Sequence, residues 1–117
     1  MPKPNPQISD SELLLAARDL RVKCIEMIAK AGNGHPGGSL SLADLVTALY
    51  FKVLKHDPKN PTWKERDRFI LSKGHGVPAV YAAMAMTGYF PESDLADFRQ
   101  VGSPLQGHPD RHRLPGI

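Results

Sequence analysis

The sequence predicts an α/β fold that is mostly helical in this segment and has about one strand. Apolar residues recur at helical spacing over residues 10–31 and again in later segments. A short apolar run at 68–72 ends at Gly74-His75-Gly76, just before a helix start, as strands do in α/β proteins. One strand cannot form a sheet, so this fold class requires further strands from outside the segment.

Bulk properties narrow the class of protein. A chain of 117 residues, 41% hydrophobic and 23% charged, has the size and composition of one globular domain. The net charge of +3 is dispersed along the chain, so we expect no nucleic-acid interface. No apolar run approaches the roughly 20 residues of a membrane span, and the polar start lacks a secretory signal. The single cysteine, Cys24, excludes an internal disulfide, and we expect a cytoplasmic protein without membrane contact.

The first elements are an arm and a long helix. Residues 1–8 are rich in proline and polar side chains, and we expect an extended N-terminal arm. Ser9 and Glu12 form a capping-box signature, which predicts a helix over residues 10–31 that ends at Gly32. Its buried face would carry Leu13, Ala17, Leu20, Cys24, Met27, Ile28 and Ala31.

A glycine-rich loop and a second helix follow. Residues 32–39 hold four glycines and a proline among eight residues, which predicts an irregular loop. Ser41, with Asp44 at the box position, would cap a helix that must stop before Pro58. Residues 57–61 have the composition of a turn.

The remaining elements are shorter. After the predicted strand at 68–72, Pro78 at a first helical position opens a helix over 79–86 that Gly88 ends. That helix has almost no polar residue, so we expect burial on all sides. Residues 91–99 suggest a short helix with Leu95 and Phe98 turned inward. Residues 101–117 have no periodicity and predict irregular chain.

Three histidines follow glycines in three separate loops: His35, His75 and His108. Bare glycine backbone beside an imidazole suits close approach of a ligand with hydroxyl or phosphate oxygens. A single such histidine is as well explained by a turn, but the recurrence favours a ligand site. His56 and His112 have polar neighbours, and we interpret both as solvent-exposed.

A zinc site is the rival interpretation of the histidines. His108 and His112 are four residues apart, but Pro109 disfavours a regular helical face between them. The only thiol belongs to a predicted helix, and no carboxylate spacing completes a ligand set. We therefore predict no metal ligands in this chain.

Three stretches, GNGHPGGSLSLADLVTALY, DRFILSKGHGVPAVYAAMAMTGYF and LADFRQVGSPLQGHPDRHRLPGI, resemble the amino-terminal part of transketolase in order and spacing. The run at 37–41 resembles especially the split transketolases of bacteria and archaea, whose halves are separate polypeptides. The resemblance implies a partial thiamine diphosphate-binding domain over 9–117. It also implies transfer of a two-carbon ketol unit from a ketose phosphate to an aldose phosphate, as in the pentose phosphate pathway.

The same resemblance implies residue roles. His35 and His108 would contact the substrate as catalytic-site residues, while His75 and Lys73 would lie at the cofactor diphosphate. The Mg²⁺ or Ca²⁺ ligands, the glycine-rich segment at the aminopyrimidine and the activating glutamate would all lie outside this chain. The chain would then be inactive alone and require the rest of the enzyme or a carboxyl-terminal subunit, in a unit that forms a homodimer.

Some features leave alternatives open. Asn33 stands where the family commonly has serine, although a carboxamide can still donate and accept hydrogen bonds. A related thiamine diphosphate synthase, of the dihydroxyacetone or deoxyxylulose phosphate type, is one alternative. The sequence of residues 68–75 argues against the deoxyxylulose phosphate type. A noncatalytic interaction module is the other.

Overall fold

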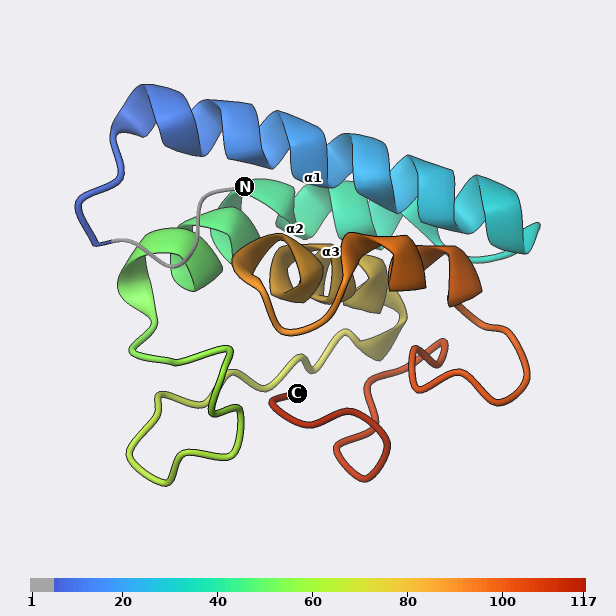
Figure 1. Ribbon diagram of the computed structural model, residues 1–117. Helices are drawn as coiled ribbons and strands as arrows, with labels where there is room; N and C mark the ends of the chain where they lie inside the picture. The colour runs from blue at the N-terminus through green and yellow to red at the C-terminus, as the bar shows by residue number, and fades with distance from the viewer. Residues whose placement is uncertain (1–5) are drawn as a thin grey trace.

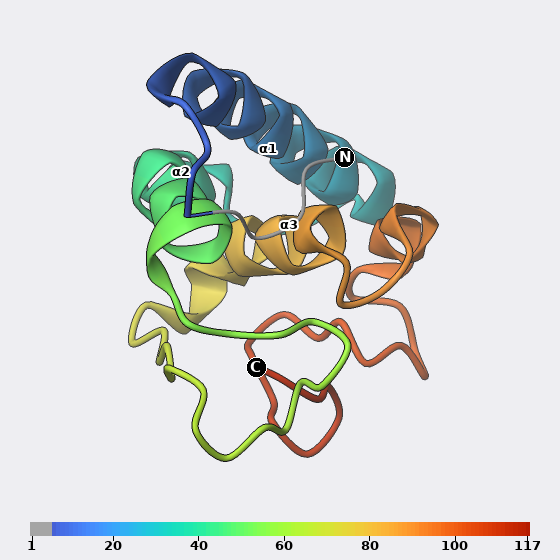
Figure 2. The same ribbon diagram turned by 60° about the vertical axis from the view of Figure 1, so that its left-hand side comes forward.

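Helices form one half of the molecule and irregular chain forms the other. The computed structural model describes residues 6–117, with α1 (Asp10–Ala31), α2 (Pro36–Ala48), the π-helix η1 (Leu49–Val53), the 3₁₀ turn η2 (Gly74–Gly76), α3 (Val77–Thr87) and the 3₁₀ helix η3 (Glu92–Asp97). Figures 1 and 2 show the connecting segment 54–73 and the C-terminal segment gathered below the helices. No helix within 6–117 is long and apolar enough to cross a bilayer.

The prediction for α1 is confirmed at both ends. The Ser9 hydroxyl accepts a hydrogen bond from the Glu12 amide at 3.2 Å, and Gly32 ends the helix in a left-handed conformation with φ of 75°. The predicted inner face contacts the core, with Leu20 and Cys24 fully buried. Residues 1–5 of the predicted arm lie outside the described residues, while Ile8 at its end is buried.

The predicted start of the second helix is wrong. α2 begins at Pro36, with His35 at the N-cap, five residues before the predicted boundary at Ser41. Proline at a first helical position has a backbone already suited to the helix, which outweighs the low propensity of the two glycines after it. Asp44 does not complete a capping box; its carboxylate accepts from Arg21 of α1 at 3.0 Å.

A fully buried helix occupies the centre of the helical half. α3 packs against α1, α2 and η3, and all 11 of its residues are buried, as its apolar composition predicts. Val77 is its first residue and Gly88 ends it with a φ of 107°. α3 is therefore the frame on which the loops at its two ends are held.

Two short elements differ from prediction. The run at 68–72 forms no strand, because none of the residues 6–117 offers a second strand with which it could pair. It lies in irregular conformation, and the Ile70 side chain is 85% exposed. The short helix after Pro91 is a 3₁₀ helix, although Leu95 and Phe98 are buried as predicted. Residues 101–117 are irregular, as expected.

Candidate active site

Two of the predicted site histidines meet at the N-terminal ends of two helices. His35 is the N-cap of α2, and His75 lies in the η2 turn that leads into α3. Their ring centroids are 5.1 Å apart with planes at 69°, an edge-to-face contact between two exposed imidazoles. Residues 40 positions apart in sequence therefore form one surface.

Small residues allow this approach. A Cβ at Gly38 would lie 3.5 Å from the Gly76 Cα, so the backbones of α2 and η2 are in contact. The buried Ser39 hydroxyl donates to the Gly76 carbonyl at 3.4 Å. At Gly76 itself a Cβ would lie only 2.9 Å from a methyl group of Leu42, so this position has no room for a side chain. The missing side chain at Gly76 thus lets the two histidine loops approach this closely.

His108 approaches the same turn from the C-terminal segment. A Cβ at Gly74 would lie 2.5 Å from Cδ2 of His108, which places the His108 ring directly against η2. The Tyr81 hydroxyl of α3 donates to the Gln106 carbonyl at 2.7 Å and lies 3.4 Å from that of His108. Burial raises the Tyr81 pKa, so the hydroxyl remains a donor at physiological pH. The buried helix α3 thereby holds the third histidine loop.

Lys73 borders this cluster. It is the N-cap residue of η2, and its carbonyl accepts from the Gly76 amide at 2.9 Å. Its side chain is exposed and has no ion-pair or hydrogen-bond partner within 6–117. The ammonium group is therefore available to an anion at the turn that carries His75.

The donor set of this surface suits an oxygen-rich anion. Neither α2 nor α3 has a side-chain cap at its N-terminus, but at α3 the Val77 amide donates to the Gly74 carbonyl and Pro78 has no amide hydrogen, so α2 is the helix whose first-turn amides lack acceptors. Three exposed imidazoles, one ammonium group and bare glycine backbone lie around these amides. A diphosphate fits such a set, because amides and a cation pair with its charge. Within residues 6–117 no group of three His, Cys, Asp or Glu side chains could hold a metal ion.

The prediction that His56 is a solvent residue is wrong. In η1 the Leu54 amide donates to Leu49 at 2.8 Å, skipping the Tyr50 carbonyl that an α-helix would use. His56 Nε2 donates to that carbonyl at 2.7 Å, so Nδ1 is the acceptor for the Tyr89 hydroxyl at 2.6 Å. The rings of His56 and Tyr89 stack with an interplanar angle of 9°. No local pattern signals these partners, because the Tyr50 carbonyl is freed by the π-helix and Tyr89 lies 33 residues away.

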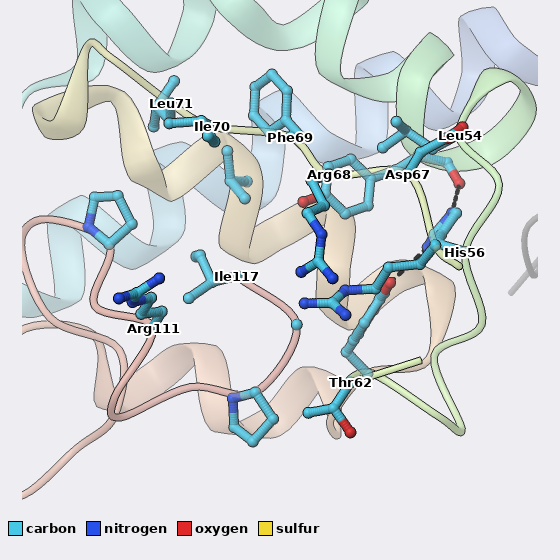
Figure 3. A pocket seen from close by; sticks show the side chains of 17 residues that line it. Leu54, His56, Thr62, Asp67, Arg68, Phe69, Ile70, Leu71, Arg111 and Ile117 are labelled. Atoms are coloured by element: carbon cyan, nitrogen blue, oxygen red, sulfur yellow. Dashed lines mark hydrogen bonds between the residues drawn. The ribbon is translucent and has the colours of Figure 1, made fainter. Parts of the chain in front are cut away.

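A cavity of about 580 Å³ lies away from the histidine cluster, beside residues 67–71 (Figure 3). It is lined by arginines and by apolar side chains of the irregular segments, including Arg68, Arg111, Phe69, Leu71 and Ile117. No backbone hydrogen bond joins residues 68–71 to the rest of 6–117. None of the three cluster histidines lines this cavity, so it is a separate feature.

The fold and the cluster define a domain suited to an anionic ligand rich in oxygen. A family model described as the thiamine diphosphate binding domain of transketolase matches residues 13–117. The chain therefore belongs to the transketolase thiamine diphosphate-binding domain family.

Relatives and solved structures agree with this family. The chain is 50% identical over 101 residues to the 6-deoxy-6-sulfo-D-fructose transketolase subunit SqwG of Clostridium sp. (strain MSTE9), covering 86% of this chain and 37% of that subunit. It is 42% identical to the transketolase of Treponema pallidum, covering 94% of this chain and 17% of the relative. The transketolase structure from Campylobacter jejuni matches with a TM-score of 0.85 and 40% identity over 94% of this chain and 17% of that one. The chain thus spans a sixth to about a third of these relatives.

Proposed function

We propose that this chain forms one wall of the active site of a transketolase, which transfers a two-carbon ketol unit between sugar phosphates. The observation that carries the proposal is the convergence of His35, His75 and His108 on one glycine-lined turn. Isolated turn histidines have no reason to meet, whereas a shared ligand accounts for all three positions.

The residues of this wall divide into two roles. His75 and Lys73 bind the diphosphate of thiamine diphosphate, since both lie at the η2 turn that leads into α3 and both can carry positive charge. His35 and His108 donate or accept hydrogen bonds at the hydroxyl and carbonyl oxygens of the sugar, and so orient it. Bound thiamine diphosphate supplies the carbanion-stabilising chemistry, while the protein supplies placement and polarity.

The rest of the machinery belongs to other parts of the enzyme. The Mg²⁺ or Ca²⁺ ligands and the activating glutamate lie outside this chain, which is inactive alone. The relative SqwG is itself named a subunit, which supports a separate carboxyl-terminal partner for this chain as well. The assembled unit forms a homodimer in the cytoplasm, with residues 9–117 as part of the cofactor domain.

The predicted strand at 68–72 completes an α/β sheet in the assembled enzyme. Its backbone amides and carbonyls at 68–71 lack hydrogen-bond partners within 6–117, and Ile70 is exposed. Strands from the remainder of the enzyme would satisfy these groups and fill the adjoining cavity. Unpaired backbone of this kind is stable in a protein only when another segment or water satisfies it.

Calorimetry on the enzyme that contains this chain tests the proposal. Thiamine diphosphate is titrated with Mg²⁺ present, into the wild type, into His75→Ala and into His112→Ala as a control on an exposed histidine outside the cluster. We expect tight binding that His75→Ala weakens at least tenfold and His112→Ala leaves unchanged. Equal affinities in all three would contradict the cofactor role of His75.

Substrate comparison separates the alternatives. Turnover of xylulose 5-phosphate with an aldose phosphate supports a transketolase, whereas turnover with formaldehyde or pyruvate as co-substrate supports the related synthases. A noncatalytic module would bind no cofactor in any assembly, so cofactor binding that depends on His75 excludes it.

A further inference from the structure

Arg99 adopts a backbone conformation that its residue type disfavours. Its φ of 63° is left-handed, and it is the only non-glycine residue within 6–117 with a positive φ. For a residue with a Cβ this conformation is unfavourable, and such strain persists only where the surrounding structure holds it. Here the Arg99 amide donates to the Leu105 carbonyl at 2.8 Å, which closes the loop after η3.

The side chain of Arg99 lies on the loop that carries His108. A Cβ at Gly107 would lie 3.2 Å from Nη1, 3.3 Å from Cζ and 3.5 Å from Nε of Arg99, so the guanidinium covers the bare face of Gly107. Arg99 is exposed, and its guanidinium has no hydrogen-bond or ion-pair partner within 6–117. An internal ion pair therefore does not explain the strained backbone conformation of Arg99.

Hydrogen bonds also hold the loop on both sides of Gly107. The Tyr81 hydroxyl donates to the Gln106 carbonyl and lies 3.4 Å from the His108 carbonyl, and the Ser103 hydroxyl accepts from the Leu105 amide at 3.1 Å. Gly107 itself makes no hydrogen bond within 6–117, and the Arg99 side chain is the group that covers it. A glycine at 99 would form the same turn at lower cost, and the arginine must therefore act through its side chain.

We propose that Arg99 is a positioning residue that holds Gly107 and so aims the His108 imidazole at the ligand. The inference rests on the proposed role of His108 at the substrate. The residue acts through His108 and does not itself touch the reacting atoms.

The test uses the assembled enzyme with Arg99→Gly, Arg99→Lys, Gly107→Ala and the double variant Arg99→Gly/Gly107→Ala. Steady-state kinetics and thermal unfolding are measured for each. Arg99→Gly relieves the backbone strain, so we expect an unchanged or higher unfolding temperature together with a fall in kcat of about tenfold to a hundredfold. Arg99→Lys keeps the positive charge but loses the contact of the planar guanidinium with Gly107, and we expect a kcat between those of the wild type and Arg99→Gly.

Gly107→Ala approaches the same contact from the other side. Its Cβ would displace the guanidinium, so kcat should fall about as far as in Arg99→Gly. The double variant has no guanidinium for the new Cβ at position 107 to displace, so we expect its kcat to equal that of Arg99→Gly. If millimolar guanidinium chloride partly restores the kcat of Arg99→Gly, the guanidinium is the group through which Arg99 acts.

His108→Ala separates failure of this inference from failure of the proposed function. If His108→Ala lowers kcat while Arg99→Gly does not, or if the losses in the double variant add, Arg99 is not a positioning residue. If His108→Ala leaves kcat unchanged, the role of His108 and this inference both fail.

Discussion

Replacement of Gly74 by alanine is the most direct test of the histidine cluster. The new Cβ would lie 2.5 Å from Cδ2 of His108, whereas ordinary contact begins at 3.4 Å, so the His108 ring must retreat by about 0.9 Å. The φ of Gly74 is not in the left-handed range, so the backbone tolerates alanine. Because His108 is exposed, the retreat should change the free energy of unfolding by less than about 0.5 kcal/mol.

The expected functional cost of Gly74→Ala is much larger. A misplacement of about 1 Å in a substrate-orienting group costs on the order of a hundredfold in rate. Steady-state turnover of xylulose 5-phosphate by the enzyme containing this chain measures the loss, and thermal unfolding verifies that the fold is retained. Gly38→Ala is the matched control, since its Cβ meets His75 at 3.7 Å, an ordinary contact, and should leave turnover unchanged. Wild-type turnover in Gly74→Ala would refute the reasoning.

Three further predictions concern stability. His56→Leu removes two part-buried hydrogen bonds and a stacked ring, so the free energy of unfolding, measured by urea titration, should fall by about 2–4 kcal/mol. Tyr89→Phe removes only one of those hydrogen bonds and should lower it by about 1 kcal/mol. Equal losses in the two variants would contradict the two-bond geometry of His56. Burial raises the Cys24 pKa from 9.0 to about 12, so only the unfolded chain gains a thiolate as pH rises above 9. Stability should therefore fall by about 1 kcal/mol from pH 9 to 10 because of Cys24. The three tyrosines, whose pKa values burial also raises from 10.0, add to the fall near pH 10, so Cys24→Val should reduce the slope and not abolish it. Gly76→Ala should lower the free energy of unfolding by about 1–3 kcal/mol, because the new Cβ would lie 2.9 Å from a methyl group of Leu42. Adding Leu42→Val to this variant should recover part of the lost stability. If it recovers none, the strain does not arise from the contact with Leu42.

Contacts within a few residues account for the elements that could be predicted. The bounds of α1 follow from the Ser9 cap, its apolar period and the left-handed Gly32, all of which act inside the helix. The burial of α3 follows from its lack of polar side chains. By contrast, the start of α2 was misplaced because two competing local signals were present, and the backbone contact between Gly38 and Gly76 favours the earlier start.

The candidate site also has features that the sequence predicts and features that depend on tertiary packing. Glycine-flanked histidines predict a ligand surface from the sequence, because bare backbone and imidazole are local properties. That the three loops meet is decided by the packing of α2 on η2 and by the Tyr81 bond from α3. The partners of His56 and the strained conformation of Arg99 have no sequence signal, since each depends on residues distant in the chain or on the closure of a loop.

The sequence by itself determined both ends of α1, the burial of α3, the motifs that resemble transketolase and the identity of the three histidines. Only the tertiary structure decided that these histidines share one turn, that His56 is bound between two tyrosines, and that residues 68–71 remain unpaired. The physical reason is the range of the forces involved. Caps and periodicity act within a few residues, whereas ring contacts, backbone approach and strand pairing depend on which distant segments are present to meet.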